Sequence, residues 1–199
     1  MSENSIRKEI VEIGRRIYKL GYASATDGNI SYRSGNRIFV TPSGVGKGDL
    51  TIAGIVVVNL EGKILSGKMT PTSELRMHLA ALRLRPDVNA VIHAHPPYAT
   101  ALSLAGINFD DYLLPEVVLT LKRIPTVRYA RPASEDNALA ISEFIKEYDA
   151  LVLKQHGVLT VGKNLLDAFH NLERIEFSAK IIAIARMVGE IEPLPKQEA

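Results

Sequence analysis

The apolar run Ala90-Val91-Ile92, which ends in His93-Ala94-His95, constrains this chain more than any other feature. A short apolar run of this kind favours a buried strand, and residues i and i+2 of a strand point to the same face. His93 and His95 are therefore expected on one face at the end of a strand. Two imidazoles on one face can bind one metal ion. The pattern predicts a sheet with a metal site at a strand end.

Two further residues extend this set of potential ligands. His156 follows a second apolar run, residues 150–153, and precedes Gly157, while Glu74 opens a predicted helix upstream of the histidine pair. An isolated histidine at a strand end is more often a hydrogen-bonded or exposed side chain than a ligand. Three imidazoles and one carboxylate together are nevertheless sufficient for a metal-assisted reaction.

Length and composition limit the class of protein. At about 150 residues per domain, 199 residues predict one domain spanning 1–199, with residues 191–199 as a frayed tail. The net charge is only +2, and no Lys/Arg block is long enough to predict nucleic-acid binding. The absence of cysteine excludes disulfides and thiolate chemistry, so a metal must use histidine or oxygen ligands.

The sequence pattern also predicts no targeting segment. The first residues lack the apolar segment of a signal peptide, and no apolar run reaches the roughly 18 residues that span a bilayer. We therefore expect a cytoplasmic protein without a membrane partner.

Strand and helix patterns alternate along the chain and predict an α/β fold with three layers, α/β/α, around a mixed central sheet. Strands are expected at 30–33, 37–41, 55–60, 63–65, 90–94, 124–129, 150–155 and 158–161. Helices are expected at 6–17, 73–84, 97–104, 134–146 and 164–188.

Three loops have the composition of anion-binding loops: residues 26–31, 41–44 and 71–74. Glycine lets backbone N–H groups approach a ligand closely, and Ser, Thr and Asn add side-chain donors. The third loop also precedes a predicted helix, whose N-terminus favours phosphate. Ordinary turns and helix caps use the same residue types, so each loop alone is weak evidence.

Taken together, these segments resemble the class II aldolase/adducin head family. The family motifs occur in order over about residues 6–188 as Gly28-Asn29-Ile30-Ser31, Thr41-Pro42-Ser43-Gly44, Thr72-Ser73-Glu74, His93-Ala94-His95-Pro96 and Gln155-His156-Gly157. The resemblance implies an α/β/α fold, one zinc ion per subunit and a four-fold symmetric homotetramer with active sites between subunits.

The resemblance also implies roles for individual residues. His93, His95 and His156 match the zinc ligands, and Glu74 matches the catalytic acid/base, which also ligates zinc in the resting state. The residues that match the phosphate-binding positions are Gly28, Asn29, Ser43, Gly44, Thr72 and Ser73. Ser43 and Thr72 exchange one hydroxyl residue for another relative to the family pattern. Mn²⁺, Fe²⁺ and Co²⁺ also suit such ligands.

One family residue has no clear match. A sugar-phosphate aldolase of this family uses a tyrosine from the neighbouring subunit, some twenty residues after the second histidine. Ungapped counting arrives at Leu114, and nearby Tyr112 is our candidate for this second catalytic residue. That aldolase also has a longer C-terminal end with a further tyrosine, which this sequence lacks.

The implied reaction is cleavage of a ketose 1-phosphate, such as fuculose 1-phosphate, to dihydroxyacetone phosphate and a small aldehyde such as lactaldehyde. Enzymes with a similar zinc site act instead as methylthioribulose-1-phosphate dehydratase or aldolase, or as ribulose-5-phosphate 4-epimerase. The epimerase has aspartate in place of Glu74, which favours the aldolase. A non-catalytic adducin-like assembly module is the remote alternative, because such heads lack the full metal set.

Several other charged or titratable residues receive structural interpretations. His78 lies four residues after Glu74 on the same predicted helix face, and we interpret it as structural rather than as a ligand. Arg33, Arg37 and Lys47 can steer an anionic substrate, but scattered charges of this kind usually lie on a solvated surface.

Overall fold

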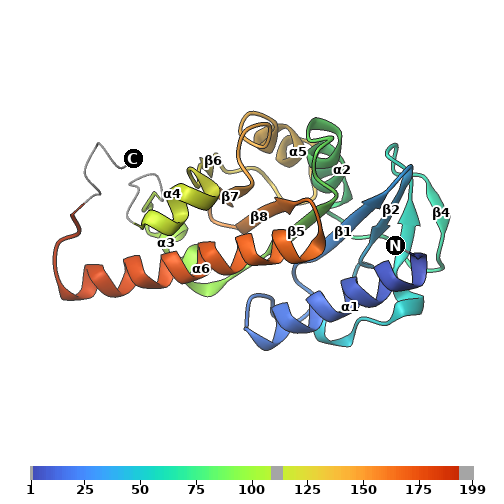
Figure 1. The fold of residues 1–199 in the computed structure, drawn as a ribbon, viewed down its shortest axis with the longest axis horizontal. Coiled ribbons are helices and arrows are strands. Elements are labelled where there is room, and N and C mark those ends of the chain that lie inside the picture. The colour runs from blue at the N-terminus through green and yellow to red at the C-terminus, as the bar shows by residue number, and fades with distance from the viewer. Residues whose placement is uncertain (1, 109–113, 193–199) are drawn as a thin grey trace.

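The computed structural model describes residues 2–108 and 114–192. In this part of the chain one eight-stranded sheet has the order β4-β3-β2-β1-β5-β8-β7-β6 (Figure 1). Only the edge pair β6 and β7 is parallel, so the sheet is mixed, as predicted. The strands are β1 (Asn29–Ser34), β2 (Arg37–Val40), β3 (Val56–Val58), β4 (Ile64–Ser66), β5 (Ala90–Ala94), β6 (Thr126–Val127), β7 (Ala150–Leu153) and β8 (Gly157–Gly162).

Helices cover both faces of this sheet, which gives the three predicted layers. In Figure 1, α1 and α6 run below the sheet, and α2 and α5 lie above it. The helices are α1 (Glu3–Lys19), α2 (Leu75–Leu84), α3 (Pro97–Leu104), α4 (Pro115–Leu121), α5 (Glu135–Ser142) and α6 (Leu165–Val188), with short 3₁₀ turns η1 (Lys47–Asp49) and η2 (Ile52–Gly54).

Strand β5 lies at the centre, between β1 and β8, and divides two apolar cores. Ile92 packs into the core between the sheet and helices α1 and α6. Val91 packs into the core on the other face, between the sheet and helices α2 and α5. His93 shares the face of Val91, because side chains alternate along a strand. A one-residue slip of β5 would turn His93 into the other core, so burial of both faces fixes the register.

Several observed elements differ from the predicted ones: for example, β3 and β6 are shorter than the predicted strands at 55–60 and 124–129. Helix α4 was not predicted, since it is short and buries only Val117 and Leu121. Helix α5 ends at Ser142 rather than at 146. Helix α2 begins at Leu75 rather than at 73, because the backbone of Glu74 leaves the helical region and occupies the cap position.

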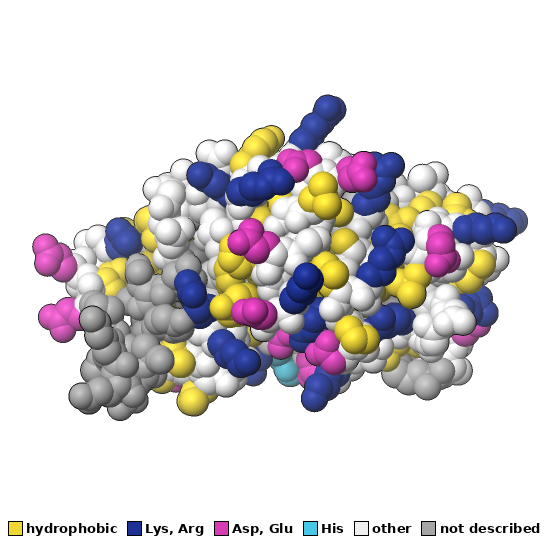
Figure 2. Space-filling model, turned by 90° about the horizontal axis from the view of Figure 1, so that it is seen from above, with side chains coloured by type: hydrophobic (Ala, Val, Ile, Leu, Met, Phe, Trp, Pro, Cys, Tyr) yellow, Lys and Arg dark blue, Asp and Glu magenta, His cyan; other side chains and the backbone are white. Residues whose placement is uncertain are grey.

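The exposed surface carries mixed charge. On the face seen from above in Figure 2, Lys and Arg side chains are interspersed with Asp, Glu and apolar side chains. No helix within the described residues is both long and apolar enough to cross a membrane. At the C-terminal end Ile191 packs against the core, and residues 193–199 of the predicted frayed tail lie outside the described residues.

Candidate active site

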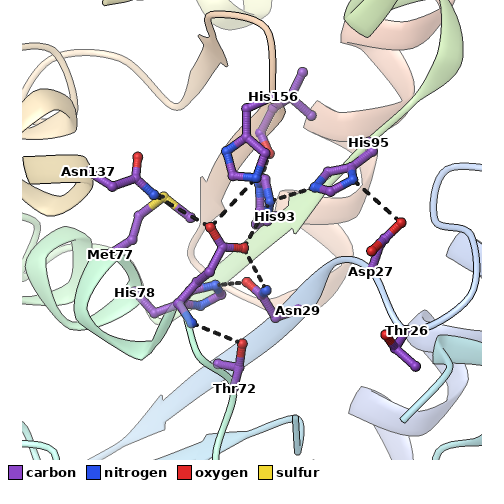
Figure 3. Close-up of polar contacts among 12 residues, drawn as sticks. Thr26, Asp27, Asn29, Thr72, Met77, His78, His93, His95, Asn137 and His156 are labelled. Atoms are coloured by element: carbon purple, nitrogen blue, oxygen red, sulfur yellow. Dashed lines mark hydrogen bonds and ion pairs between the residues drawn. The ribbon is translucent and has the colours of Figure 1, made fainter. Parts of the chain in front are cut away.

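His93 is the fixed centre of the site. Its ring is fully buried at the end of β5, and Nδ1 lies 2.8 Å from the carbonyl oxygen of Val158 on β8. A carbonyl only accepts, so Nδ1 carries a proton and Nε2 faces the other way. Nε2 lies 2.9 Å from Nε2 of His95 and 3.1 Å from a carboxylate oxygen of Glu74 (Figure 3).

His156 arrives from the turn between β7 and β8. Gln155 has a φ of 57°, and Gly157 follows where an added Cβ would lie 2.4 Å from the carbonyl oxygen of Ala94. Glycine is therefore required at 157 for the turn to approach β5 so closely. Ligand nitrogens of His93, His95 and His156 all lie within 4.8 Å of one another, so this cluster is able to hold a metal ion.

Glu74 completes the cluster from the cap of α2. One carboxylate oxygen, Oε2, accepts a hydrogen bond from Nδ2 of Asn29 at 3.0 Å. The other, Oε1, lies 3.7 Å from Nε2 of His156 and accepts a longer contact of 3.5 Å from Nδ2 of Asn137 on α5. The side chain makes no helix-cap bond, because it is turned toward His93 and His156.

Electrostatics in this cluster demand a positive charge. Burial by itself raises the pKa of Glu74, but the adjacent His93 and the hydrogen bonds from His93 and Asn29 outweigh it and hold that pKa well below its ordinary value. Burial, and then repulsion from His93, lowers the pKa of His95 and of His156 to about 4 in each case. These two rings are neutral at neutral pH and present lone pairs.

The donor set fits a divalent metal. Lone pairs of imidazole and carboxylate that converge at about 3 Å repel unless a proton or cation lies between them. Three imidazoles and one carboxylate are donor types that zinc accepts. Asp27 lies 3.9 Å from Nδ1 of His95, on the outer side of the cluster, at a distance too long for a direct hydrogen bond.

The three predicted anion loops meet beside this cluster. They line a pocket of about 230 Å³ together with Glu74, His95 and His156. All six residues predicted to bind phosphate line it, namely Gly28, Asn29, Ser43, Gly44, Thr72 and Ser73. No Lys or Arg side chain is among the described residues that line the pocket.

Backbone contacts bring these loops together. Pro42 and Pro71 form an isolated antiparallel bridge, and the amide of Thr72 donates to the carbonyl of Thr41 at 3.1 Å. Lys47 connects the loop at 26–31 with the end of the loop at 41–44. Its ammonium donates to the carbonyl of Thr26 at 3.3 Å and to that of Val45 at 2.7 Å. Main-chain contacts and the buried ammonium of Lys47 therefore hold the three loops together.

Comparison with known proteins identifies the family and the fold. Residues 8–183 match the family model described as the class II aldolase and adducin N-terminal domain. The chain belongs to the class II aldolase family. This family is metal-dependent, which agrees with the histidine cluster, and it acts on sugar phosphates.

Individual relatives carry more than one activity in their names. An L-fuculose phosphate aldolase of Methanococcus maripaludis is 37% identical, over 87% of this chain and 93% of its own. A 3-oxo-tetronate 4-phosphate decarboxylase of Pectobacterium atrosepticum is 34% identical, over 92% and 86%. A solved L-fuculose 1-phosphate aldolase superposes with a TM-score of 0.92 at 29% identity, covering all of this chain and 94% of the other. Lyase activity is common to these names.

Sequence reasoning missed Asn137, which lies on α5 and contacts Glu74. Its position three residues after the helix-capping Ser134 gave no signal of a site role. Tyr112, the predicted second catalytic residue, lies outside the described residues.

Two charged residues differ from the surface interpretation. Lys47 is 1% exposed, and burial lowers its pKa to about 8. Arg33 donates to the carbonyls of Leu82 and Arg85 near the end of α2, so it is a structural cation rather than one that steers a substrate.

Proposed function

We propose that this protein is a zinc-dependent aldolase that cleaves a ketose 1-phosphate to dihydroxyacetone phosphate and a small aldehyde. Fuculose 1-phosphate, with lactaldehyde as the released aldehyde, is the model substrate. The observation that carries this proposal is the contact of Glu74 with the three-histidine cluster, in a pocket that the six candidate phosphate-binding residues also line.

In this proposal His93, His95 and His156 hold one zinc ion, with Glu74 as a fourth ligand in the resting state. The bound metal supplies Lewis-acid stabilisation of the negative charge that develops on the substrate oxygens. Gly28, Asn29, Ser43, Gly44, Thr72 and Ser73 bind the phosphate through backbone N–H groups and short polar side chains. Holding the phosphate places the reacting carbons at a fixed distance from the histidines.

Glu74 moves the proton. In cleavage the carbon–carbon bond breaks and its electron pair remains on the fragment that carries the phosphate. The substrate hydroxyl that becomes the aldehyde loses a proton, which passes through Tyr112 to solvent. Glu74, which starts as a carboxylate, takes up a proton from solvent and delivers it to the carbon of the phosphate-bearing fragment, which gives dihydroxyacetone phosphate. In condensation Glu74 removes that proton. Its place next to Ser73 means that phosphate binding also directs the carboxylate.

The proposal extends to assembly and location. We infer a homotetramer with four-fold symmetry, a single domain over residues 1–199, and action in the cytoplasm. Tyr112 is the proposed donor of a proton to the aldehyde oxygen, from a neighbouring subunit.

A decarboxylase is the second candidate, because two relatives carry the name 3-oxo-tetronate 4-phosphate decarboxylase. The substrate of such an enzyme brings a carboxylate as well as a phosphate. Among the described residues that line the pocket, no Lys or Arg side chain is present to bind a substrate carboxylate in addition to the phosphate. This favours a ketose phosphate without a carboxylate, which would release a neutral aldehyde. The epimerase alternative is disfavoured by glutamate rather than aspartate at position 74.

The test combines metal analysis with substrate assays. Purified protein is expected to contain one first-row metal per chain. It should release dihydroxyacetone phosphate from at least one of fuculose, rhamnulose and methylthioribulose 1-phosphates. Release of carbon dioxide from 3-oxo-tetronate 4-phosphate, without aldol cleavage of any ketose 1-phosphate, would replace the aldolase with the decarboxylase.

A further inference from the structure

A chain of three hydrogen bonds runs behind Glu74, on the side away from the histidines. Oγ of Ser31 lies 2.7 Å from Nδ1 of His78, and Nε2 of His78 lies 2.5 Å from Oδ1 of Asn29. Nδ2 of Asn29 then donates to Oε2 of Glu74 at 3.0 Å. Ser31 and His78 are fully buried, and Asn29 and Glu74 are 5% and 7% exposed. Figure 3 shows His78 in contact with Asn29.

Topology explains how these residues meet. Asn29 and Ser31 lie on the face of β1 that α2 covers, and the β1–β5 register places Asn29 directly opposite His93. His78 lies one helical turn after Glu74 on α2, so both side chains face the same part of the sheet.

Each hydrogen bond in the chain has only one allowed direction. An ionised carboxylate only accepts, so Asn29 must present its NH₂ group to Glu74 and its carbonyl oxygen to His78. That carbonyl oxygen also only accepts, so His78 must carry its proton on Nε2. In the neutral ring Nδ1 is then an acceptor, which requires the Ser31 hydroxyl to donate.

We propose that His78 is a positioning residue of the lyase reaction, which fixes the amide orientation of Asn29 and through it the carboxylate of Glu74. A flipped amide would set its oxygen against the Glu74 carboxylate and its NH₂ group against the Nε2–H of His78. Both contacts would be repulsive in a buried setting, so the chain holds a single arrangement.

The orientation of the Asn29 amide affects both Glu74 and the phosphate pocket. The NH₂ group of Asn29 has two hydrogens, and Glu74 uses one of them. Asn29 also lines the pocket, so its second N–H is available to the substrate phosphate. This step rests on the proposed function: one amide would then set the distance between the proton-transferring carboxylate and the bound phosphate.

Stability alone does not account for this chain. Replacing buried hydrogen-bonded partners with apolar groups of similar shape is often nearly neutral for stability. Three polar residues in the apolar layer beneath α2 gain little stability over an apolar set, whereas they fix the orientation of an otherwise symmetric amide.

The test is a double-mutant cycle on kcat and KM for the ketose 1-phosphate that the protein cleaves best. His78→Leu removes both ring contacts and is expected to lower kcat/KM by about 10- to 100-fold, the usual effect of losing a residue that orients a metal site. In an Asn29→Ala background, adding His78→Leu should lower kcat/KM by less than about a further 3-fold. The reason is that the hydrogen bonds linking His78 to Glu74 pass through Asn29, which is already removed. Equal losses in both backgrounds would overturn the proposal.

Conservative replacement and matched controls separate positioning from folding. The amide of His78→Gln can still donate to Asn29, so this variant should stay closer to the native kcat than His78→Leu. Thr160→Val removes another fully buried hydroxyl, which bonds the carbonyl of Ala168 on α6, on the face of the sheet opposite to His93. It should lower Tm without lowering kcat. If His78→Leu fails to fold, Ser31→Ala takes its place in the cycle, and a native kcat in Ser31→Ala would contradict the proposal.

A measurement without turnover separates this inference from the proposed function. Nitrogen-15 NMR of the metal-loaded native protein should show His78 as the Nε2–H tautomer, with Nδ1 accepting a hydrogen bond. Finding the Nδ1–H tautomer would overturn the positioning chain whatever the activity. The Nε2–H tautomer in a protein that cleaves no ketose phosphate would leave the chain intact and refute the aldolase.

Discussion

The histidine cluster and the anion loops face one pocket, but they are built on different principles. The cluster stands at strand ends in the middle of the sheet, and its central ring, His93, is fully buried and bonded to Val158. The loops leave Ser43, Gly44 and Ser73 exposed, and they are tied together mainly through backbone contacts.

This difference separates two kinds of residue requirement. In the cluster the side chain is the functional group, and burial fixes where its nitrogen points. In the loops backbone conformation supplies donors, so small residues with a hydroxyl are interchangeable there. Gly28 links the two regions, because its φ is +73° and an added Cβ would lie 3.0 Å from the carbonyl oxygen of His93.

The largest effect is expected from removing a cluster ligand. His95→Ala should abolish stoichiometric metal binding and lower kcat by about 1,000-fold or more, because the metal supplies several kcal/mol of charge stabilisation. Elemental analysis and the cleavage assay measure both quantities. His170→Ala, on α6 and outside the cluster, is the matched control. A metal-free variant with native activity would show that the reaction does not need a metal at the histidine cluster.

The next effect concerns the carboxylate between the two regions. Glu74→Gln should slow solvent deuterium exchange into dihydroxyacetone phosphate by about 100-fold or more, since the amide keeps the shape but cannot take a proton. Phosphate binding should persist. Glu173→Gln, a partly exposed residue of α6, should exchange normally. If Glu74→Gln exchanged deuterium at the native rate, Glu74 would have only a structural role at the start of α2.

A smaller effect is expected in the loops. Ser43→Ala removes one donor to the phosphate and should raise KM by about 10-fold with kcat nearly unchanged, because that contact is present in ground and transition states alike. Ser142→Ala, whose hydroxyl bonds within α5, is the control. An unchanged KM together with a lowered kcat would place Ser43 in the chemical step and blur the distinction between the regions.

The last prediction concerns a different quantity, the free energy of unfolding of the metal-free protein. The folded-state pKa of His95 and of His156 is about 4, below the ordinary value of 6.5. Between these pH values the unfolded chain binds protons that the folded chain does not. The free energy of unfolding should therefore fall as pH drops through this window, by up to ~1.4 kcal/mol per pH unit for each ring.

Urea unfolding at several pH values, with a chelator present, measures this slope. A variant with both His95 and His156 replaced by Ala should show a flatter dependence between pH 6.5 and 4. An equally steep slope in that variant would assign the acid sensitivity to other groups.

The sequence predicted the elements with strong periodicity and missed the weak ones. The strand at 90–94 and the long final helix were placed within a residue of their observed bounds. Helix α4 has only seven residues and little buried surface, so its pattern was too short to detect. Lys47 was assigned to the surface because no local pattern shows that carbonyls of two distant loops surround its ammonium.

The site shows the same division. Periodicity placed His93 and His95 on one face, residue type and position added His156, Glu74 and the three loops as candidates, and the family motifs implied their individual roles. Asn137 carried no sequence signal, because its contact with Glu74 spans 63 positions and depends on how α5 packs against α2. His78 was interpreted only as structural, since its partners Asn29 and Ser31 lie on β1, 49 and 47 positions away in the sequence.

By itself the sequence determined the alternation of strands and helices, the chemical identity of the ligands and the small residues of the loops. These are local properties, set by backbone preference and side-chain chemistry. Tertiary structure alone decided which nitrogen of His93 faces the cluster, which way the amide of Asn29 points and how far the pKa of Glu74 is lowered. Each depends on partners brought together by strand register and helix packing, and burial makes a wrong orientation costly.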